Sequence, residues 1–278
     1  MLTLHQVRKT FFPGTVNQRV ALDGIDLDLA AGEFVTVIGS NGAGKSTLLN
    51  HVSGMLRPDS GTVQINGRDV TALSEHARAR WIGRVFQDPR QGTAPELTIE
   101  QNLAIAYLRG RGRWLRHGVT RARRDLFRDE LQTLEQGLEN RLTAKVGLLS
   151  GGQRQSLSLL MATFSEPKVL LLDEHTAALD PQRAALVVRL TEELVKRHRP
   201  TTLMVTHNME QALDLGDRLI MMHEGRVIAD LSGDRKKHAT VPDLLDAFTQ
   251  VHAGLSDRSL LKSSAPADAP VDLRKSRP

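Results

Sequence analysis

The chain has 278 residues, of which 40% are hydrophobic, enough for one substantial core or a core with an inserted subdomain. It has no cysteine, which excludes disulfides, thiolate metal sites and cysteine nucleophiles and is compatible with a reducing cytosol. The net charge of +5 is modest, and the low aromatic content of 4% disfavours a base-stacking surface for single-stranded nucleic acid.

The N-terminal residues predict antiparallel sheet. Apolar and polar residues alternate over 25–29, and Leu2 and Leu4 have the same spacing. This period of two is typical of a strand with one buried face.

Three later segments predict strands of another kind. They are short, uninterrupted apolar runs, typical of parallel strands buried on both faces: 34–38, 169–172 and 202–205. No run approaches the roughly 18 apolar residues of a membrane-spanning helix, and no basic segment followed by an apolar stretch stands at the N-terminus. We therefore expect a soluble chain whose role at a membrane is peripheral.

A glycine-rich loop follows the first of these apolar runs. Residues 39–47 read GSNGAGKST and fit the spacing G-x-x-x-x-G-K-[ST], whose glycines let backbone N–H groups point inward around anionic oxygens. Lys45 brings a positive charge to the outer phosphates, and the Ser46 hydroxyl is suited to Mg²⁺. The next residues begin a helix whose positive end faces the phosphates. The predicted nucleotide contacts are Asn41, Gly42, Ala43, Gly44, Lys45, Ser46 and Thr47.

Residues 88–166 are polar, arginine-rich and periodic in leucine, which predicts a mostly helical inserted subdomain. Two interpretations of the arginines stay open: a surface for anionic lipid or nucleic acid phosphates, or a solvated helix face or loop, the commoner case for charge runs. These arginines are Arg109, Arg111, Arg113, Arg116, Arg121, Arg123, Arg124 and Arg128.

A second candidate phosphate-binding element lies at residues 149–153, which read LSGGQ and precede an apolar helical run. Ser150 is a good N-cap, and the two glycines after it would expose helix N–H groups to an anion. Taken alone, the segment is equally an ordinary capped helix start.

Two acidic residues follow the second apolar run, and a histidine lies just beyond the third. In open parallel sheets ligands bind at the carboxyl edge, where these side chains are expected. Asp173 is suited to hold Mg²⁺ through its water shell, and Glu174 to orient or deprotonate a water beyond the terminal phosphate. A lone histidine is more often a packed or surface residue, but its strand context favours His207 as a donor to the terminal phosphate.

The predicted divisions are a nucleotide-binding core over 1–87 and 167–253, a helical subdomain over 88–166 and a tail over 254–278. The tail is rich in Ser, Ala and Pro and is expected to be disordered. No internal repeat is evident, which indicates one nucleotide-binding module per chain.

Six motifs together resemble those of the ABC ATPase family, in order and spacing, over about residues 1–240. They are GSNGAGKST at 39–47, VFQD at 85–88, LSGGQ at 149–153, VLLLDE at 169–174, AALD at 177–180 and VTH at 205–207. The resemblance implies an α/β fold, a P-loop NTPase with a RecA-like core, an antiparallel β subdomain and an inserted α-helical signature subdomain. It further implies an ATPase whose two subunits pack head to tail as a homodimer around two ATP molecules.

The same resemblance implies the roles of single residues. Each ATP is held by the Lys45 loop of one subunit and by the signature motif of the other, through Ser150, Gly151, Gly152 and Gln153. The implied catalytic residues are Glu174, His207 and Gln87, and the implied Mg²⁺ contacts are Ser46, Gln87 and Asp173. Phe11 is the expected partner of the adenine, with Phe12 as the alternative. Asp180 is expected to help align the two sites, and residues 97–103 to lie near the groove for a permease helix.

The chain departs from the family pattern at three positions. His175 stands where the family usually has Pro, Ala177 where it has Ser, and Met161 where many relatives carry Arg. The segments 156–163, 173–181 and 205–209 are similar to a group of bacterial importers for amino acids or similar small solutes.

That resemblance implies an integral membrane permease, an extracytoplasmic solute-binding protein and a peripheral location on the cytoplasmic face of the cell membrane. One alternative is an ABC ATPase that acts on nucleic acid or the ribosome. It is disfavoured because such proteins resemble a different plan, with two nucleotide modules in one chain or large inserted elements, and this sequence shows neither. Another alternative is a nucleotide-binding module without turnover, which Glu174 and His207 argue against.

Overall fold

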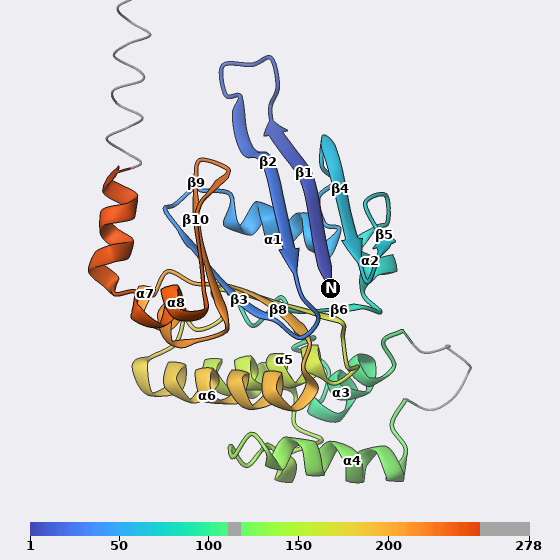
Figure 1. Cartoon of the computed structure of the whole chain (residues 1–278). Coiled ribbons are helices and arrows are strands. Elements are labelled where there is room, and N and C mark those ends of the chain that lie inside the picture. Colours follow the sequence, from blue (N-terminus) through green and yellow to red (C-terminus); the bar gives the residue numbers. More distant parts are fainter. Residues whose placement is uncertain (111–117, 251–278) are drawn as a thin grey trace, which may run out of the picture. The chain divides into compact units, whose positions relative to one another are not determined.

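The principal sheet has six strands in the order β10-β9-β3-β8-β7-β6 (Figure 1). The structure is a computed structural model that describes residues 1–110 and 118–250. All neighbours pair in parallel except β9 and β10, which are antiparallel. The runs predicted as central parallel strands are confirmed as β3, β7 and β8. The strands are β3 (Phe34–Gly39), β6 (Ile82–Val85), β7 (Val169–Asp173), β8 (Thr201–Val205), β9 (Arg218–His223) and β10 (Arg226–Ser232).

A second sheet has four strands in the order β2-β1-β4-β5, and each pair is antiparallel. It contains the alternating N-terminal segments, so that prediction is also confirmed. Its strands are β1 (Leu2–Phe11), β2 (Arg19–Leu29), β4 (Ser60–Ile65) and β5 (Arg68–Asp69).

Helices cover both faces of the principal sheet, with α1 on one face and α5 and α6 on the other (Figure 1). Successive residues of β7 accordingly belong to different cores: Val169 and Leu171 pack in the cluster that includes Leu48 of α1, and Leu170 and Leu172 in the one that includes Leu157 of α5. Because side chains alternate between faces along a strand, burial of both faces requires the continuous apolar run seen in the sequence.

The helices are α1 (Lys45–Ser53), α2 (Glu75–Arg78), α3 (Ile99–Tyr107), α4 (Arg121–Gln132), α5 (Gly151–Thr163), α6 (Pro181–His198), α7 (Met209–Asp214) and α8 (Gly233–His238). The described part of 88–166 contains α3, α4, α5 and two short 3₁₀ helices, Leu138–Asn140 and Val146–Leu148. The helical content expected there is therefore present, with α5 starting at the signature motif.

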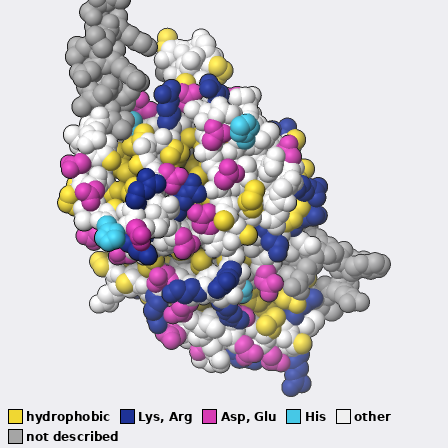
Figure 2. Space-filling model, viewed as in Figure 1, with side chains coloured by type: hydrophobic (Ala, Val, Ile, Leu, Met, Phe, Trp, Pro, Cys, Tyr) yellow, Lys and Arg dark blue, Asp and Glu magenta, His cyan; other side chains and the backbone are white. Residues whose placement is uncertain are grey.

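Several arginines of the 109–128 run contact the chain itself. Arg124 donates to both carboxylate oxygens of Glu100, at 2.7 and 3.1 Å, and the Arg123 guanidinium lies over the Tyr107 ring. On the face seen in Figure 2, basic and acidic side chains are interspersed. These contacts favour the interpretation of a solvated helix face for the arginines of α4, whereas Arg109 lies outside the helices and is partly buried. Arg111, Arg113 and Arg116 lie outside the described residues.

Residues Met1–His238 form one compact unit, and the described residues 239–250 belong to a second. In the second unit residues 241–250 are helical, and the Asp243 carboxylate accepts hydrogen bonds from the backbone and hydroxyl of Thr240. The tail predicted over 254–278 lies outside the described residues. Within 1–110 and 118–250, no helix combines the length and apolar character needed to cross a membrane.

Candidate functional site

The glycine-rich loop joins β3 to α1, where the sequence predicted it. Gly44 has φ of 100°, in the left-handed region, and a Cβ there would lie 2.3 Å from the Ala21 carbonyl oxygen. Both the backbone conformation and the lack of space require glycine. The loop thus brings its N–H groups to the start of α1, where the positive end of the helix favours an anion.

Lys45, the first residue of α1, folds back onto this loop. Its buried Nζ donates to the carbonyl oxygens of Gly39, at 2.7 Å, and Ser40, at 3.1 Å. Burial lowers the pKa of the Lys45 ammonium, while the negative charges of Glu174 and Asp173 act in the opposite direction. The ammonium is therefore held beside the loop by weak carbonyl acceptors, which phosphate oxygens can replace.

A cleft of 340 Å³ lies over the loop and is lined by residues from distant parts of the chain. The predicted residues Lys45, Glu174 and His207 all line it, because the strands that precede them end at the same edge of the sheet. The lining comprises Phe11, Arg19, Ala21, Asn41, Gly42, Ala43, Gly44, Lys45, Ser46, Thr47, Glu174 and His207.

Of the two adjacent phenylalanines proposed for the base, only Phe11 lines this cleft. Phe12 is 66% exposed and its ring centroid lies 6.5 Å from that of Phe11. The geometry therefore favours Phe11 as the aromatic surface for an adenine.

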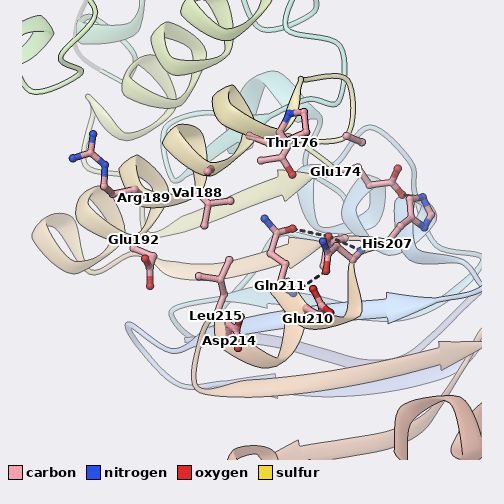
Figure 3. Close-up of a pocket in the computed structure, with 16 residues that line it drawn as sticks. Glu174, Thr176, Val188, Arg189, Glu192, His207, Glu210, Gln211, Asp214 and Leu215 are labelled. Carbon is pink, nitrogen blue, oxygen red and sulfur yellow. Dashed lines mark hydrogen bonds and ion pairs between the residues drawn. The ribbon is translucent and has the colours of Figure 1, made fainter. Parts of the chain in front are cut away.

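Glu174 and His207 form a close pair. His207 Nε2 lies 2.5 Å from Glu174 Oε1, and the side chains approach each other at one end of the hollow drawn in Figure 3. The glutamate side chain is only 10% exposed, whereas the histidine is 47% exposed. The histidine was expected to face a phosphate, and here it contacts the carboxylate expected to act on water.

The backbone of Glu174 is held in an uncommon conformation. Its φ is 45°, its N–H donates to the Val205 carbonyl at 2.9 Å, and its own carbonyl accepts from the Ala177 N–H at 3.0 Å. A non-glycine residue in the left-handed region costs roughly 1–2 kcal/mol, so its surroundings must impose it. Such strain commonly occurs at functional sites.

Glu174 and His207 also border a larger hollow of 720 Å³, lined mainly by residues of α6 and α7 (Figure 3). Its charged lining includes three further carboxylates, from Glu192, Glu210 and Asp214, and one guanidinium, from Arg189. Net negative charge repels phosphate, whereas the loop cleft contains Lys45 and Arg19. The charge of the two hollows therefore favours the loop side of the Glu174–His207 pair for a group as anionic as a triphosphate.

The three residues expected at Mg²⁺ offer oxygen donors, which this ion prefers. Of the three, only Ser46 lines the loop cleft. Asp173 forms an ion pair with Arg84, Gln87 is exposed, and neither belongs to the cleft lining. The described residues include no group of three or more His, Cys, Asp or Glu side chains that could hold a metal. This donor set fits an ion bound by few protein ligands and completed by phosphate and water.

The signature motif begins α5 with a complete capping box. Ser150 Oγ accepts from the Gln153 N–H at 3.3 Å, and Gln153 Oε1 accepts from the Ser150 N–H at 3.2 Å. A Cβ on Gly152 would lie 2.8 Å from Arg183 Cδ, so the glycine permits α6 to pack closely. The N-cap prediction for Ser150 is confirmed, and the Gln153 side chain is engaged with its own helix.

A hollow of 370 Å³ beside the motif is lined by Gln136, Ser150, Gly152, Gln153, Ser156, Arg183, Leu186 and Val187. None of these residues lines the loop cleft. The two predicted phosphate-binding elements are therefore separate sites within one chain, as a head-to-tail dimer requires.

Arg19 was missed by sequence reasoning. It begins β2, lines the loop cleft, and donates from Nη2 to the Gly42 carbonyl at 2.8 Å. An isolated arginine ahead of an alternating strand carries no signal for phosphate binding. Only the antiparallel pairing of β1 and β2 brings Arg19 opposite Phe11, at the mouth of the cleft.

Comparison with known proteins gives a consistent result. The protein family described as ABC transporter matches residues 22–177. A tyrosine transport ATP-binding protein of Clostridioides difficile is 43% identical over 252 residues, 89% of this chain and 98% of that protein. An aliphatic sulfonates import ATP-binding protein of Nocardia farcinica is 34% identical over 93% of this chain and 95% of that protein.

Solved structures of similar chains agree. The dimeric post-hydrolysis state of the ATP-binding cassette MJ0796, bound to ADP and Pi, matches with a TM-score of 0.71 and 30% identity over 84% of this chain and 98% of that chain. The ADP conformation of the cassette MJ1267 matches with a TM-score of 0.73 and 27% identity, over 90% of this chain and 98% of that chain. The predicted α/β fold of a P-loop NTPase is thereby confirmed.

Proposed function

The chain belongs to the ABC transporter family as an ATP-binding, ATP-hydrolysing subunit, and we propose that it powers uptake of an amino acid or similar small solute through a separate permease. The relative that supports the solute class is the tyrosine transport protein, whose length the match covers almost entirely. The relatives are named for tyrosine transport, aliphatic sulfonate import and methionine import, and none of these names refers to nucleic acid or the ribosome. The alternative of an ABC ATPase that acts on nucleic acid or the ribosome therefore has no support.

We propose that ATP occupies the loop cleft. Its adenine stacks on Phe11, and its phosphates contact the N–H groups of residues 41–47 and the Lys45 ammonium. Replacement of two carbonyl acceptors by phosphate oxygens strengthens the bonds of Lys45, because a hydrogen bond between charged groups is stronger than one to a neutral carbonyl. Arg19 adds a second positive charge at the cleft mouth.

Ser46, Asp173 and Gln87 would hold Mg²⁺, which neutralises phosphate charge when bound. The Glu174 carboxylate orients or deprotonates a water on the far side of the terminal phosphate. His207 lies against that carboxylate. We expect its Nε2 to leave Glu174 and donate to the terminal phosphate when ATP binds. Positioning and charge stabilisation of this kind supply most of the rate in phosphoryl transfer.

We further propose a head-to-tail homodimer in which Ser150, Gly151, Gly152 and Gln153 of one subunit close the ATP site of the other. Because the Gln153 side chain is engaged in the capping box, the contacts come from the Ser150 hydroxyl and the helix N–H groups. Asp180, which accepts from the Arg183 N–H at the start of α6, lies in the segment expected to align the sites.

From the family motifs we also propose the domain boundaries: a core over 1–87 and 167–253, a helical subdomain over 88–166 and a tail over 254–278. We further propose a peripheral position on the cytoplasmic face of the membrane and an extracytoplasmic solute-binding protein as a partner. Residues 97–103 are the expected contact with the permease.

The observation that best supports this function is that three strand ends bring Lys45, Glu174 and His207 into one cleft. The test is purification of the full-length chain under native conditions, followed by an ATPase assay and identification of bound partners. We expect hydrolysis and a multispanning permease; co-purified ribosomes or DNA would contradict the proposal. Uptake of tyrosine against an aliphatic sulfonate by the reconstituted complex then tests the solute class.

A further inference from the structure

A buried side chain of the signature helix contacts the backbone beside two of the proposed catalytic residues. Gln155 lies on α5, and its Nε2 donates to the carbonyl oxygens of Phe86, at 3.1 Å, and His175, at 2.7 Å. Phe86 immediately precedes Gln87, and His175 immediately follows Glu174. One amide group thus fixes two separate loops at the positions adjoining Gln87 and Glu174.

We infer that Gln155 is a positioning residue for hydrolysis: its two N–H donors hold the loops that carry Gln87 and Glu174 in register with each other and with the signature helix. A primary amide is suited to this task, because its two hydrogens diverge from one nitrogen and reach two acceptors at once. The inference deepens the proposed function and rests on it.

The surroundings of Gln155 indicate a directional role rather than space filling. Its Oε1 is buried and has no hydrogen-bond partner among the residues that the structure describes. A core position that needed only volume would be better filled by an apolar side chain, because an unpaired buried oxygen is unfavourable. In Gln155 the amide nitrogen uses both of its donors, and the amide oxygen has no partner among the described residues.

The loop after Glu174 is anchored from the other side as well. His175 Nε2 lies 3.0 Å from Thr191 Oγ1 of α6, and that hydroxyl donates to the Val187 carbonyl at 2.8 Å. Gln155 and Thr191 therefore hold the backbone and the ring of the same buried residue. The loop is fixed between α5 and α6, which leaves Glu174 little freedom to drift.

The position of Gln155 on α5 connects the two phosphate-binding elements. It lies five residues after Ser150, roughly 7 Å along the helix, in the same rigid element that begins with the capping box. In the proposed dimer the ATP gripped by Ser150 belongs to the partner subunit. A displacement of α5 by that ATP would reach Gln87 and Glu174 of its own subunit through Gln155.

The test compares kcat and the ATP dissociation constant of the full-length wild type with Gln155→Met and Gln155→Asn. Methionine keeps the length and removes both donors; asparagine keeps the donors but withdraws them by one methylene. We expect kcat to fall roughly tenfold to a hundredfold in both variants, with ATP binding changed less than about twofold, because misplacement affects the chemical step more than ground-state binding.

Thr163→Val is the matched control. Thr163 is a buried polar residue at the far end of α5, and among residues 1–110 and 118–250 its hydroxyl bonds only the carbonyls of Leu159 and Leu160 in its own helix. It should lose thermal stability and retain kcat. Thermal midpoints identify which variants are folded, and Gln155→Asn is the milder change if Gln155→Met does not fold.

Three outcomes separate the hypotheses. Wild-type kcat in a folded Gln155 variant would overturn the positioning role, and so would an ATP affinity that falls in parallel with kcat. Absence of hydrolysis by the wild-type complex would instead contradict the proposed function itself.

Discussion

Arg84 Nη2 lies 2.9 Å from Asp173 Oδ2, in an ion pair between the neighbouring strands β6 and β7. The arginine side chain is only 9% exposed, and its Nη1 also donates to Ser53 Oγ at 3.3 Å. A fixed positive charge therefore lies against the carboxylate that we propose for Mg²⁺. This pairing makes the two cations competitors for one carboxylate.

Replacement of Arg84 by methionine should lower the Mg²⁺ concentration that half-saturates ATP hydrolysis by about tenfold, or about 1.4 kcal/mol, because it removes a cation that competes with Mg²⁺ for the Asp173 carboxylate. A Mg²⁺ titration of the ATPase rate measures it. Arg128→Met, which removes an exposed arginine paired with Asp125, is the control and should leave the titration unchanged. An increased Mg²⁺ requirement in Arg84→Met would mean that the arginine orients Asp173 instead.

Glu174→Gln should reduce kcat by about a hundredfold to ten-thousandfold, the usual contribution of a general base, and leave ATP binding intact. The amide keeps the size and the contact with His207 but cannot accept a proton. Trapped dimer should accumulate with ATP and can be measured by size-exclusion chromatography. Substantial residual turnover would remove Glu174 from the role of base.

Phe11→Ala should weaken ATP binding by about tenfold, since an aromatic contact contributes roughly 0.5–1.5 kcal/mol beyond burial. Phe12→Ala is a matched control at the next position, because Phe12 does not line the cleft. Titration with a fluorescent ATP analogue distinguishes the two. Equal losses in both variants, or a larger loss in Phe12→Ala, would contradict the assignment of the adenine to Phe11.

The buried His175 predicts a pH-dependent stability. Burial lowers the pKa of its imidazole from an ordinary 6.5 to about 4, so the unfolded chain binds the proton more tightly than the folded one. The free energy of unfolding that the neutral His175 imidazole contributes is therefore fully present above about pH 6.5. It is lost as the pH falls toward 4, by about 3 kcal/mol in total.

Urea unfolding measures this effect. From about pH 8 to about pH 5, the free energy of unfolding of the wild type should fall by about 2 kcal/mol more than that of His175→Gln. His76→Gln, at an exposed histidine of α2, is the control and should follow the wild type. Identical pH dependence in the wild type and His175→Gln would show that the imidazole does not titrate in this way.

The sequence predicted the parts of the fold whose cause is local. Continuous apolar runs revealed β3, β7 and β8, because both faces of these strands are buried. The neighbouring β6 has both faces covered too, but Gly83 and Arg84 interrupt its four residues. Its apolar pattern was therefore too short to recognise, and its place beside β7 comes from tertiary packing.

The site divides in the same way. Loop and cap residues such as Gly44 and Ser150 were predictable, since a short spacing determines their backbone geometry. Arg19, Arg84 and Gln155 were not, because each acts on a group at least 20 residues away in the sequence. Only the folded arrangement assigns partners to such side chains.

The left-handed backbone at Glu174 limits which amino acids this position accepts, apart from any chemistry. Asparagine, aspartate and glycine adopt that conformation at low cost, whereas valine, isoleucine and threonine do not. In a saturation library, β-branched replacements should therefore reduce yield as well as turnover, while glycine should give abundant, inactive protein. At this position the expression level would report whether a residue tolerates the left-handed backbone, and the ATPase rate would report whether it can act on the proton. The two measurements would therefore distinguish two separate constraints on residue 174.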